Sequence, residues 1–269
     1  AEAGEGRQNG HPFHGVTATV HHGHTHHYKY DQNGSVISAP QGHFEYTADN
    51  HLQLMYLNER RWTRFDYGPN GDRFRQFLRH GDRSEVTLYV GLFERVIEYG
   101  LSKNSDFLYP SKFSGFARFV KSRHYIRNQT GMLAVVETEE TFANTELFER
   151  QGRHVLEWHG KKLVSDTSYL HTDQLGSVVR VTNHAGRIAK RSWYNPWGGR
   201  EDSFASDATK RKLQNWSRGY TGHEHIDTFA VIHMNGRVYN PALGLFLSAD
   251  PIDRISADPQ SGNGYTYVR

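Results

Sequence analysis

Three groups of residues in this chain have side chains and spacings that can bind metals or move protons. His22, His24 and His26 alternate near the start of the chain. In an extended strand they share one face, because side chains alternate with period two. Imidazoles arranged in this way can bind zinc, copper or nickel. No carboxylate accompanies them and Gly23 interrupts the segment, so a polar, solvated strand edge is the favoured interpretation and we expect no metal site.

The second group is His223, Glu224 and His225, within "GHEHID". A zinc protease signature has two histidines four residues apart on a helix, with a glutamate after the first. Here the histidines are two residues apart, which argues against such a site. The chain also has no Gly-x-Ser-x-Gly elbow, no phosphate-binding glycine loop and no cysteine, so nucleophilic and nucleotide-dependent enzymes lose support and no cofactor is expected.

The third group is a pair of Asp-Pro dipeptides, at Asp250 and Asp258. Two carboxylates that share a proton can activate water for peptide hydrolysis. The alternative is that each Asp-Pro begins a turn, since aspartate hydrogen-bonds to the backbone ahead of it and proline fixes φ. The residues alone favour the turn.

Composition indicates β structure. The mean hydropathy is −0.75, yet the chain has 15 Tyr, 15 Phe and 5 Trp, and aromatic side chains favour strands. Its 32 basic and 29 acidic residues are interspersed, which indicates a solvated surface rather than a nucleic-acid interface. Apolar runs such as "MLAVV" are too short to span a bilayer. No signal peptide opens the chain and it begins with alanine, so we expect a piece of a longer protein.

One local pattern recurs: an aromatic or β-branched strand, a polar turn that ends in glycine, and a second strand. It occurs at Asn33-Gly34, at Asn70-Gly71, around Gly186 and at Asn235-Gly236. Asn-Gly tolerates the positive φ angles of a two-residue type I′ hairpin. We therefore predict an all-β fold: an extended antiparallel sheet of repeated hairpins with few short helices. Residues 206–216 are either one of those helices or a loop.

The C-terminal third resembles the Rhs or YD-repeat family. The residues that carry the resemblance are "YLHTDQLGSVVRVTNHAGRIAKRSWYNPWG" at 169–198 and "GYTGHEHIDTFAVIHMNGRVYNPALGLFLSADP" at 219–251. Family members share a Tyr-x-His-x-Asp-x-Leu-Gly-Ser segment and an Arg-x-Tyr-Asp-Pro-x-x-Gly-Arg-Phe-x-Ser-x-Asp-Pro segment. The earlier hairpins look like ordinary YD repeats.

The resemblance implies a sheet that spirals into a hollow shell, with residues 1–168 as hairpins of the shell wall. Residues 169–269 then form the repeat-associated core region, which closes the C-terminal end of one continuous structure. Such shells enclose a largely unfolded C-terminal toxin in interbacterial or insecticidal systems. The implied partners are the rest of the chain's own polypeptide, the toxin, and a secretion apparatus or toxin-complex subunit, with no nucleic acid and no membrane span. The implied location is outside the producing cell.

The family also has a self-cleaving step that resembles an aspartyl protease. Motif positions assign charge stabilisation to Arg237 and general acid–base chemistry to Asp250. The second catalytic aspartate lies in an Asp-Pro-x-Gly-Leu motif that this sequence lacks, and Asn240 and Leu245 depart from the family pattern. We therefore expect this chain alone not to be an enzyme. Two alternatives to encapsulation stay open: a self-cleaving module that releases the toxin, and a carbohydrate or cell-surface binding module of the teneurin type.

Overall fold

A computed structural model describes residues 2–3, 14–100, 117–129, 131–150, 153–207, 216–250 and 263–267. The chain forms two compact units that interleave in sequence. Unit 1 contains residues 1–57, 193–201 and 217–269, and unit 2 contains residues 58–192 and 202–216. The candidate helix at 206–216 lies mostly outside the described residues. The short helices that are described are the 3₁₀ turns η2 (Tyr220–Gly222) and η3 (Asp227–Phe229).

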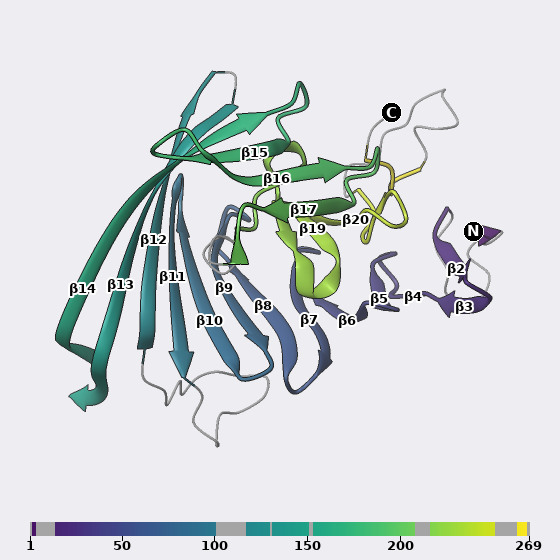
Figure 1. The fold of residues 1–269 in the computed structure, drawn as a ribbon. Helices are drawn as coiled ribbons and strands as arrows, with labels where there is room; N and C mark the ends of the chain where they lie inside the picture. Colours follow the sequence, from purple (N-terminus) through teal and green to yellow (C-terminus); the bar gives the residue numbers. More distant parts are fainter. Residues whose placement is uncertain are drawn as a thin grey trace. The chain divides into compact units, whose positions relative to one another are not determined.

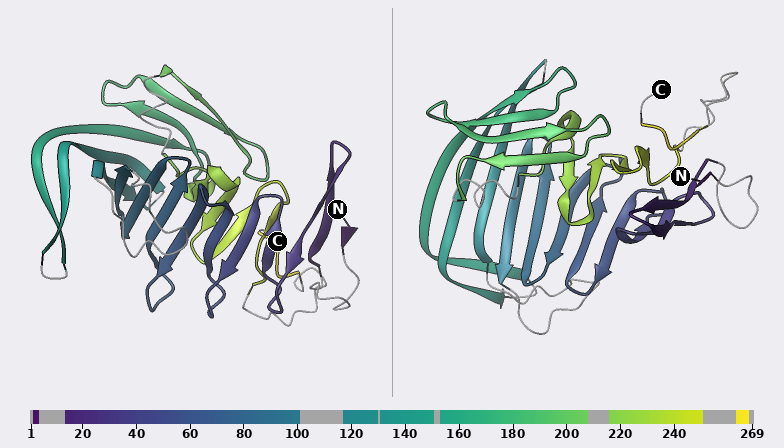
Figure 2. Two further views of the ribbon diagram at one scale, coloured as in Figure 1. Left: turned by 90° about the horizontal axis from the view of Figure 1, so that it is seen from below. Right: turned by 45° about the vertical axis from the view of Figure 1, so that its right-hand side comes forward.

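Fourteen strands form one antiparallel sheet in which the spatial order is the chain order, from β4 to β17. Figure 1 shows this succession for β8 to β14, and Figure 2 shows it from two other directions. The strands are β4 (Lys29–Tyr30), β5 (Val36–Ala39), β6 (Gly42–Tyr46), β7 (Leu52–Asn58), β8 (Arg61–Tyr67), β9 (Arg73–His80), β10 (Arg83–Val90), β11 (Phe93–Gly100), β12 (Ala117–Asn128), β13 (Gly131–Arg150), β14 (Arg153–Thr172), β15 (Val178–Asn183), β16 (Ile188–Tyr194) and β17 (Arg200–Phe204). The predicted all-β run of hairpins is confirmed.

Two small antiparallel sheets accompany it. One contains β1 (Glu2–Ala3), β2 (Val16–His21) and β3 (His24–His27), and the other contains β18 (Glu224–Ile226), β19 (Val231–Met234), β20 (Arg237–Asn240) and β21 (Leu245–Phe246).

Four of the turns between described strands share the same side-chain hydrogen bonds. At Asp31 the carboxylate accepts hydrogen bonds from the N–H groups of Asn33 (2.9 Å) and Ser35 (2.8 Å). Gly34 follows at φ 81° and donates to the Asp31 carbonyl. The same pattern begins at Asp173, Asn183 and Asn195. These are three-residue loops with a left-handed glycine, so the predicted two-residue type I′ geometry is wrong at Gly34. The side-chain acceptor five residues before the next strand fixes the longer loop.

The hairpin of β19 and β20 does have a two-residue connection, Asn235-Gly236, because Met234 pairs directly with Arg237. Asn235 has a φ of 60°, which asparagine tolerates better than most residues. Gly236 does not have the positive φ that the second position of a type I′ turn requires, so the predicted turn type is wrong here too.

Each unit has its own core. In unit 2, the core cluster is Tyr125, Val135, Leu170, Val178, Val181 and Trp216. In unit 1, it is Tyr220, Ile232, Tyr239 and Phe246. Unit 1 also joins distant segments of the chain. The N–H of Val36 donates to the carbonyl of Leu247 at 2.8 Å, and the Tyr265 hydroxyl donates to the Gly34 carbonyl at 2.6 Å.

Candidate functional site

The structure brings Arg237 and Asp250 together. Arg237 is the first residue of β20, and its Nη2 lies 3.2 Å from Oδ2 of Asp250. Its Nη1 donates to the carbonyl of Gly264 at 3.0 Å, and its guanidinium carbon lies 3.8 Å from the centre of the Phe246 ring. The guanidinium is therefore held on three sides.

Backbone contacts position the carboxylate. The N–H of Asp250 donates to the Gly264 carbonyl at 2.9 Å, the same oxygen that Arg237 contacts. A Cβ on Gly264 would lie 3.2 Å from the Asp250 nitrogen, so the absence of a side chain permits this approach. Asp258, the other candidate carboxylate, lies outside the described residues.

The pair has the components of acid–base chemistry on an amide. The side chains of Arg237 and Asp250 are 21% and 23% exposed, so both are partly shielded yet reachable from solvent. A fixed guanidinium can stabilise negative charge that develops on a carbonyl oxygen. A carboxylate in hydrogen-bond reach of water can accept its proton.

The N-terminal histidines are arranged differently from the prediction. His22 and Gly23 form the turn between β2 and β3, and His22 has a φ of 49°, so it leaves the strand face that His24 and His26 occupy. His21 lies directly opposite His24 in its place. Among the residues that the structure describes, no group of three His, Asp or Glu side chains is arranged to hold a metal ion. Because His22 lies in a turn and not in a strand, the three histidines do not share one strand face as the metal-site hypothesis assumed.

The "GHEHID" histidines make structural hydrogen bonds. Nε2 of His225 accepts the N–H of Tyr220 at 3.0 Å, and Nδ1 of His223 lies 2.8 Å from the Thr221 hydroxyl. Burial, aided by the positive charge of Arg218, lowers the pKa of His223. Both rings therefore secure the η2 turn in neutral form.

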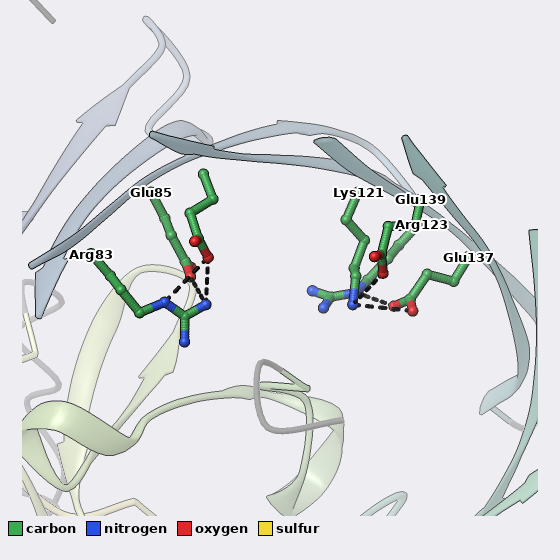
Figure 3. Close-up of polar contacts among 7 residues, drawn as sticks. Arg83, Glu85, Lys121, Arg123, Glu137 and Glu139 are labelled. Atoms are coloured by element: carbon green, nitrogen blue, oxygen red, sulfur yellow. Dashed lines mark hydrogen bonds and ion pairs between the residues drawn. The ribbon is translucent and has the colours of Figure 1, made fainter. Parts of the chain in front are cut away.

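Sequence reasoning missed a buried network of charges in unit 2. Its members are Glu94, Glu98, Lys121, Arg123 and Glu137, all at most 7% exposed. The interspersed charges were interpreted as a solvated surface, and for these five residues that interpretation is wrong. Their partners come from neighbouring strands. Figure 3 shows Lys121, Arg123 and Glu137 on one face of the sheet, together with Arg83, Glu85 and Glu139.

Arg123 is the centre of this network. Its Nε lies 3.0 Å from Glu137, its Nη1 lies 3.7 Å from Glu94, and the Tyr125 hydroxyl donates to the same Glu94 oxygen at 2.9 Å. Burial lowers the pKa of Arg123, but the surrounding Tyr125, Glu137 and Glu94 raise it more, and the net pKa is above its ordinary value. The buried guanidinium therefore stays charged. An alternation of charged and apolar residues in β11, β12 and β13 was the available signal.

Comparison with known proteins finds a family model that matches the C-terminal part. Residues 163–269 match the model of the teneurin YD-shell. Over 99 residues, the chain is 30% identical to the tRNA(Glu)-specific nuclease WapA of Bacillus subtilis subsp. natto and 28% identical to the tRNA nuclease WapA of Bacillus subtilis strain 168. Those stretches are 37% of this chain but 4% of each relative, so the chain spans a small part of their length.

Solved structures share the fold over most of the chain. A crystal structure of TcdB2-TccC3-TEV matches with a TM-score of 0.64 and 17% identity, over 88% of this chain and 10% of that one. The structure of a Photorhabdus luminescens Tc holotoxin pore matches with a TM-score of 0.59 and 15% identity, over 90% and 12%. Among the described residues, no helix has the length and apolar character to cross a bilayer. Residues 163–269 therefore resemble the teneurin YD-shell, and the hairpin ladder shares its fold with the solved TcdB2-TccC3 and Tc holotoxin structures.

Proposed function

We propose that this chain is a section of shell wall that encloses a C-terminal toxin for delivery to a target cell. The observation that carries the proposal is the fourteen-strand antiparallel ladder in chain order. Each hairpin pairs with the hairpins before and after it, so a wall of this kind can be extended by adding repeats. In this proposal, residues 1–168 supply wall hairpins and residues 169–269 close the C-terminal end.

The partners follow from the same geometry. In the described residues, β4 and β17 are the terminal strands of the sheet, and unpaired strand edges invite further pairing. We assign that role to the rest of the same polypeptide, and the cargo role to a segment downstream of this chain. Delivery then requires export from the producing cell and a secretion apparatus or toxin-complex subunit.

Protease protection of the downstream segment tests encapsulation. The full gene product, with its native downstream sequence, is treated with proteinase K before and after the shell is unfolded in guanidinium chloride and diluted. The downstream segment should survive in the native protein and be degraded after unfolding. The same segment expressed alone is the control and should be degraded at once. Equal digestion in the native protein and in the isolated segment would rule out encapsulation.

A second candidate function, self-cleavage, is favoured by the geometry of Arg237 and Asp250. The pair combines a carboxylate with a fixed cation at 3.2 Å, and an aspartyl mechanism requires a further carboxylate from downstream sequence. Intact mass of the full gene product should give two masses for the wild type and one for Asp250→Asn. Asp207→Asn, at an exposed carboxylate in the described part of the chain, is the matched control and should still be cut. One uncut mass for the wild type would eliminate this candidate.

A further inference from the structure

The lining of an aromatic pocket in unit 1 includes neither Arg237 nor Asp250. Its volume is about 650 Å³, within the roughly 300–1,000 Å³ of typical ligand sites. No lining residue is charged. The lining residues are Val16, Thr19, Pro196, Trp197, Tyr220, Tyr239, Ala242, Leu243, Gly244, Leu245, Thr266 and Tyr267.

Glycines let the backbone approach the aromatic walls. A Cβ on Gly244 would lie 2.9 Å from Cε3 of Trp197, and a Cβ on Gly198 would lie 2.7 Å from Cδ1 of Tyr220. The indole of Trp197 therefore rests against backbone at Gly244, and yet this residue is 60% exposed. A large aromatic side chain that is fixed by its neighbours and still open to solvent loses little conformational entropy when a ligand covers it.

One buried hydroxyl in the pocket lining has no hydrogen bond. Tyr239 is 0% exposed, and its hydroxyl has no partner among the described residues. Its neighbours are occupied, since Tyr220 donates to the Pro196 carbonyl at 3.0 Å and Tyr267 donates to the Thr221 hydroxyl at 3.1 Å. Burial, then the proximity of Tyr220 and Tyr267, raises the pKa of Tyr239 to about 12. The hydroxyl therefore stays protonated at neutral pH and is a donor in need of an acceptor.

We propose that this pocket binds an extended, proline-containing peptide, in contact with Trp197, Tyr220 and Tyr267 and with a peptide carbonyl accepting the Tyr239 hydroxyl. A polyproline II segment has no internal hydrogen bonds, so its carbonyls are available as acceptors. Proline has no N–H, so the peptide brings few donors that the pocket must satisfy. Aromatic-lined grooves that bind such segments are an established recognition mode.

The lining disfavours the other ligand classes. A charged peptide, phosphate or nucleic acid needs opposite charge, and the lining has none. A sugar carries hydroxyls around its ring, each of which needs a partner once buried. Of the three tyrosine hydroxyls in the lining, two already donate within the protein. The side-chain donors of Tyr239 and Trp197 fit a ligand with an apolar body and a few acceptors. The proposal does not depend on encapsulation.

Tryptophan fluorescence of the full 269-residue chain, titrated with a decaproline peptide, tests this inference. A glycine–serine peptide of the same length and the disaccharide cellobiose are the comparison probes. We expect a saturable change with decaproline alone. Trp197→Ala should weaken binding at least tenfold. The matched control, Trp193→Ala, removes an indole that is 54% exposed and does not line the pocket, and it should leave the dissociation constant within twofold.

Tyr239→Phe separates binding from folding. The variant keeps the ring and removes a hydroxyl that has no partner, so thermal stability should be unchanged or higher, while decaproline binding weakens severalfold. The inference fails if decaproline gives no saturable response at millimolar concentration, if cellobiose binds instead, or if Trp193→Ala weakens binding as much as Trp197→Ala. It also fails if Tyr239→Phe binds decaproline as tightly as the wild type does.

Discussion

Replacement of Arg123 by methionine should destabilise the chain strongly. The Arg123 side chain is 4% exposed and lies against Glu137 and Glu94, which are 8% and 3% exposed. Removal of one member of a buried ion pair typically costs about 3–5 kcal/mol, because the remaining charge stays buried without compensation. In the variant, Glu94 still accepts the hydrogen bond from the Tyr125 hydroxyl, and Glu137 still has the ammonium of Lys121 at 3.2 Å. We therefore expect the lower end of that range, about 3 kcal/mol.

Urea unfolding at pH 7, followed by circular dichroism, measures this cost. The matched control is Arg127→Met on the same strand, where the arginine is exposed, and it should change stability by less than about 0.5 kcal/mol. The melting temperature should fall by roughly 6–12 °C for Arg123→Met, at about 2–4 °C per kcal/mol.

Removal of the charge left behind should reduce the defect in Arg123→Met, because a neutral polar side chain costs less to bury than an unpaired charge. Addition of Glu137→Gln should recover part of the loss at pH 7 for the same reason. A cost below 1 kcal/mol at pH 7, or one equal to that of Arg127→Met, would refute the view that the network is buried and coupled.

Three further changes test other parts of the fold. Gly68→Asn should stabilise by about 0.5–1.5 kcal/mol, because the backbone of Gly68 and Asp72 already forms the recurrent loop without its side-chain acceptor; no gain in urea midpoint would contradict the loop assignment. Tyr265→Phe should cost about 1–2 kcal/mol, since its buried hydroxyl donates to Gly34 at 2.6 Å, and a neutral result would show that this bond adds nothing. Burial, opposed by Arg83 and assisted by Glu98, raises the pKa of Glu85. The stability linked to that raised pKa is present below the unfolded value and lost as the pH rises through the folded one. Glu85→Gln should therefore be more stable than the wild type at pH 7 and less pH-dependent, and a lower melting temperature at pH 7 with unchanged pH dependence would oppose this.

The hairpins could be predicted because their signals are local. An Asp or Asn acceptor and a glycine three residues later are both within one turn, as at Asp173 and Gly176. The bond between Val36 and Leu247 could not be predicted in this way. It joins segments 211 residues apart, and nothing in either segment specifies the other. Motif positions alone assigned roles to Arg237 and Asp250, and in the structure Nη2 of Arg237 lies 3.2 Å from Oδ2 of Asp250.

The buried charges escaped prediction because their partners lie on other strands. Glu94 lies opposite Arg123, and Arg123 lies opposite Glu137. In the sequence these residues are separated by 29 and 14 positions, so each one reads as an isolated charge in an alternating strand. Only the register of β11, β12 and β13 brings Glu94, Arg123 and Glu137 side by side in one row across the sheet.

That row has a consequence for how the long strands find their partners. β13 and β14 each contain 20 residues, far longer than the strands of about 5–6 residues that are typical, and a long ladder has many alternative registers. A slip of one residue moves every side chain to the opposite face. Such a slip between β12 and β13 would put Glu137 on the opposite face from Arg123, and Arg123 would lose this partner and keep only Glu94. The charge row therefore penalises one-residue slips among β11, β12 and β13, because each such slip breaks an ion pair. On this reasoning Arg123→Met should lose uniqueness of pairing as well as stability, which amide hydrogen exchange across β12 and β13 would detect as lower protection relative to Arg127→Met.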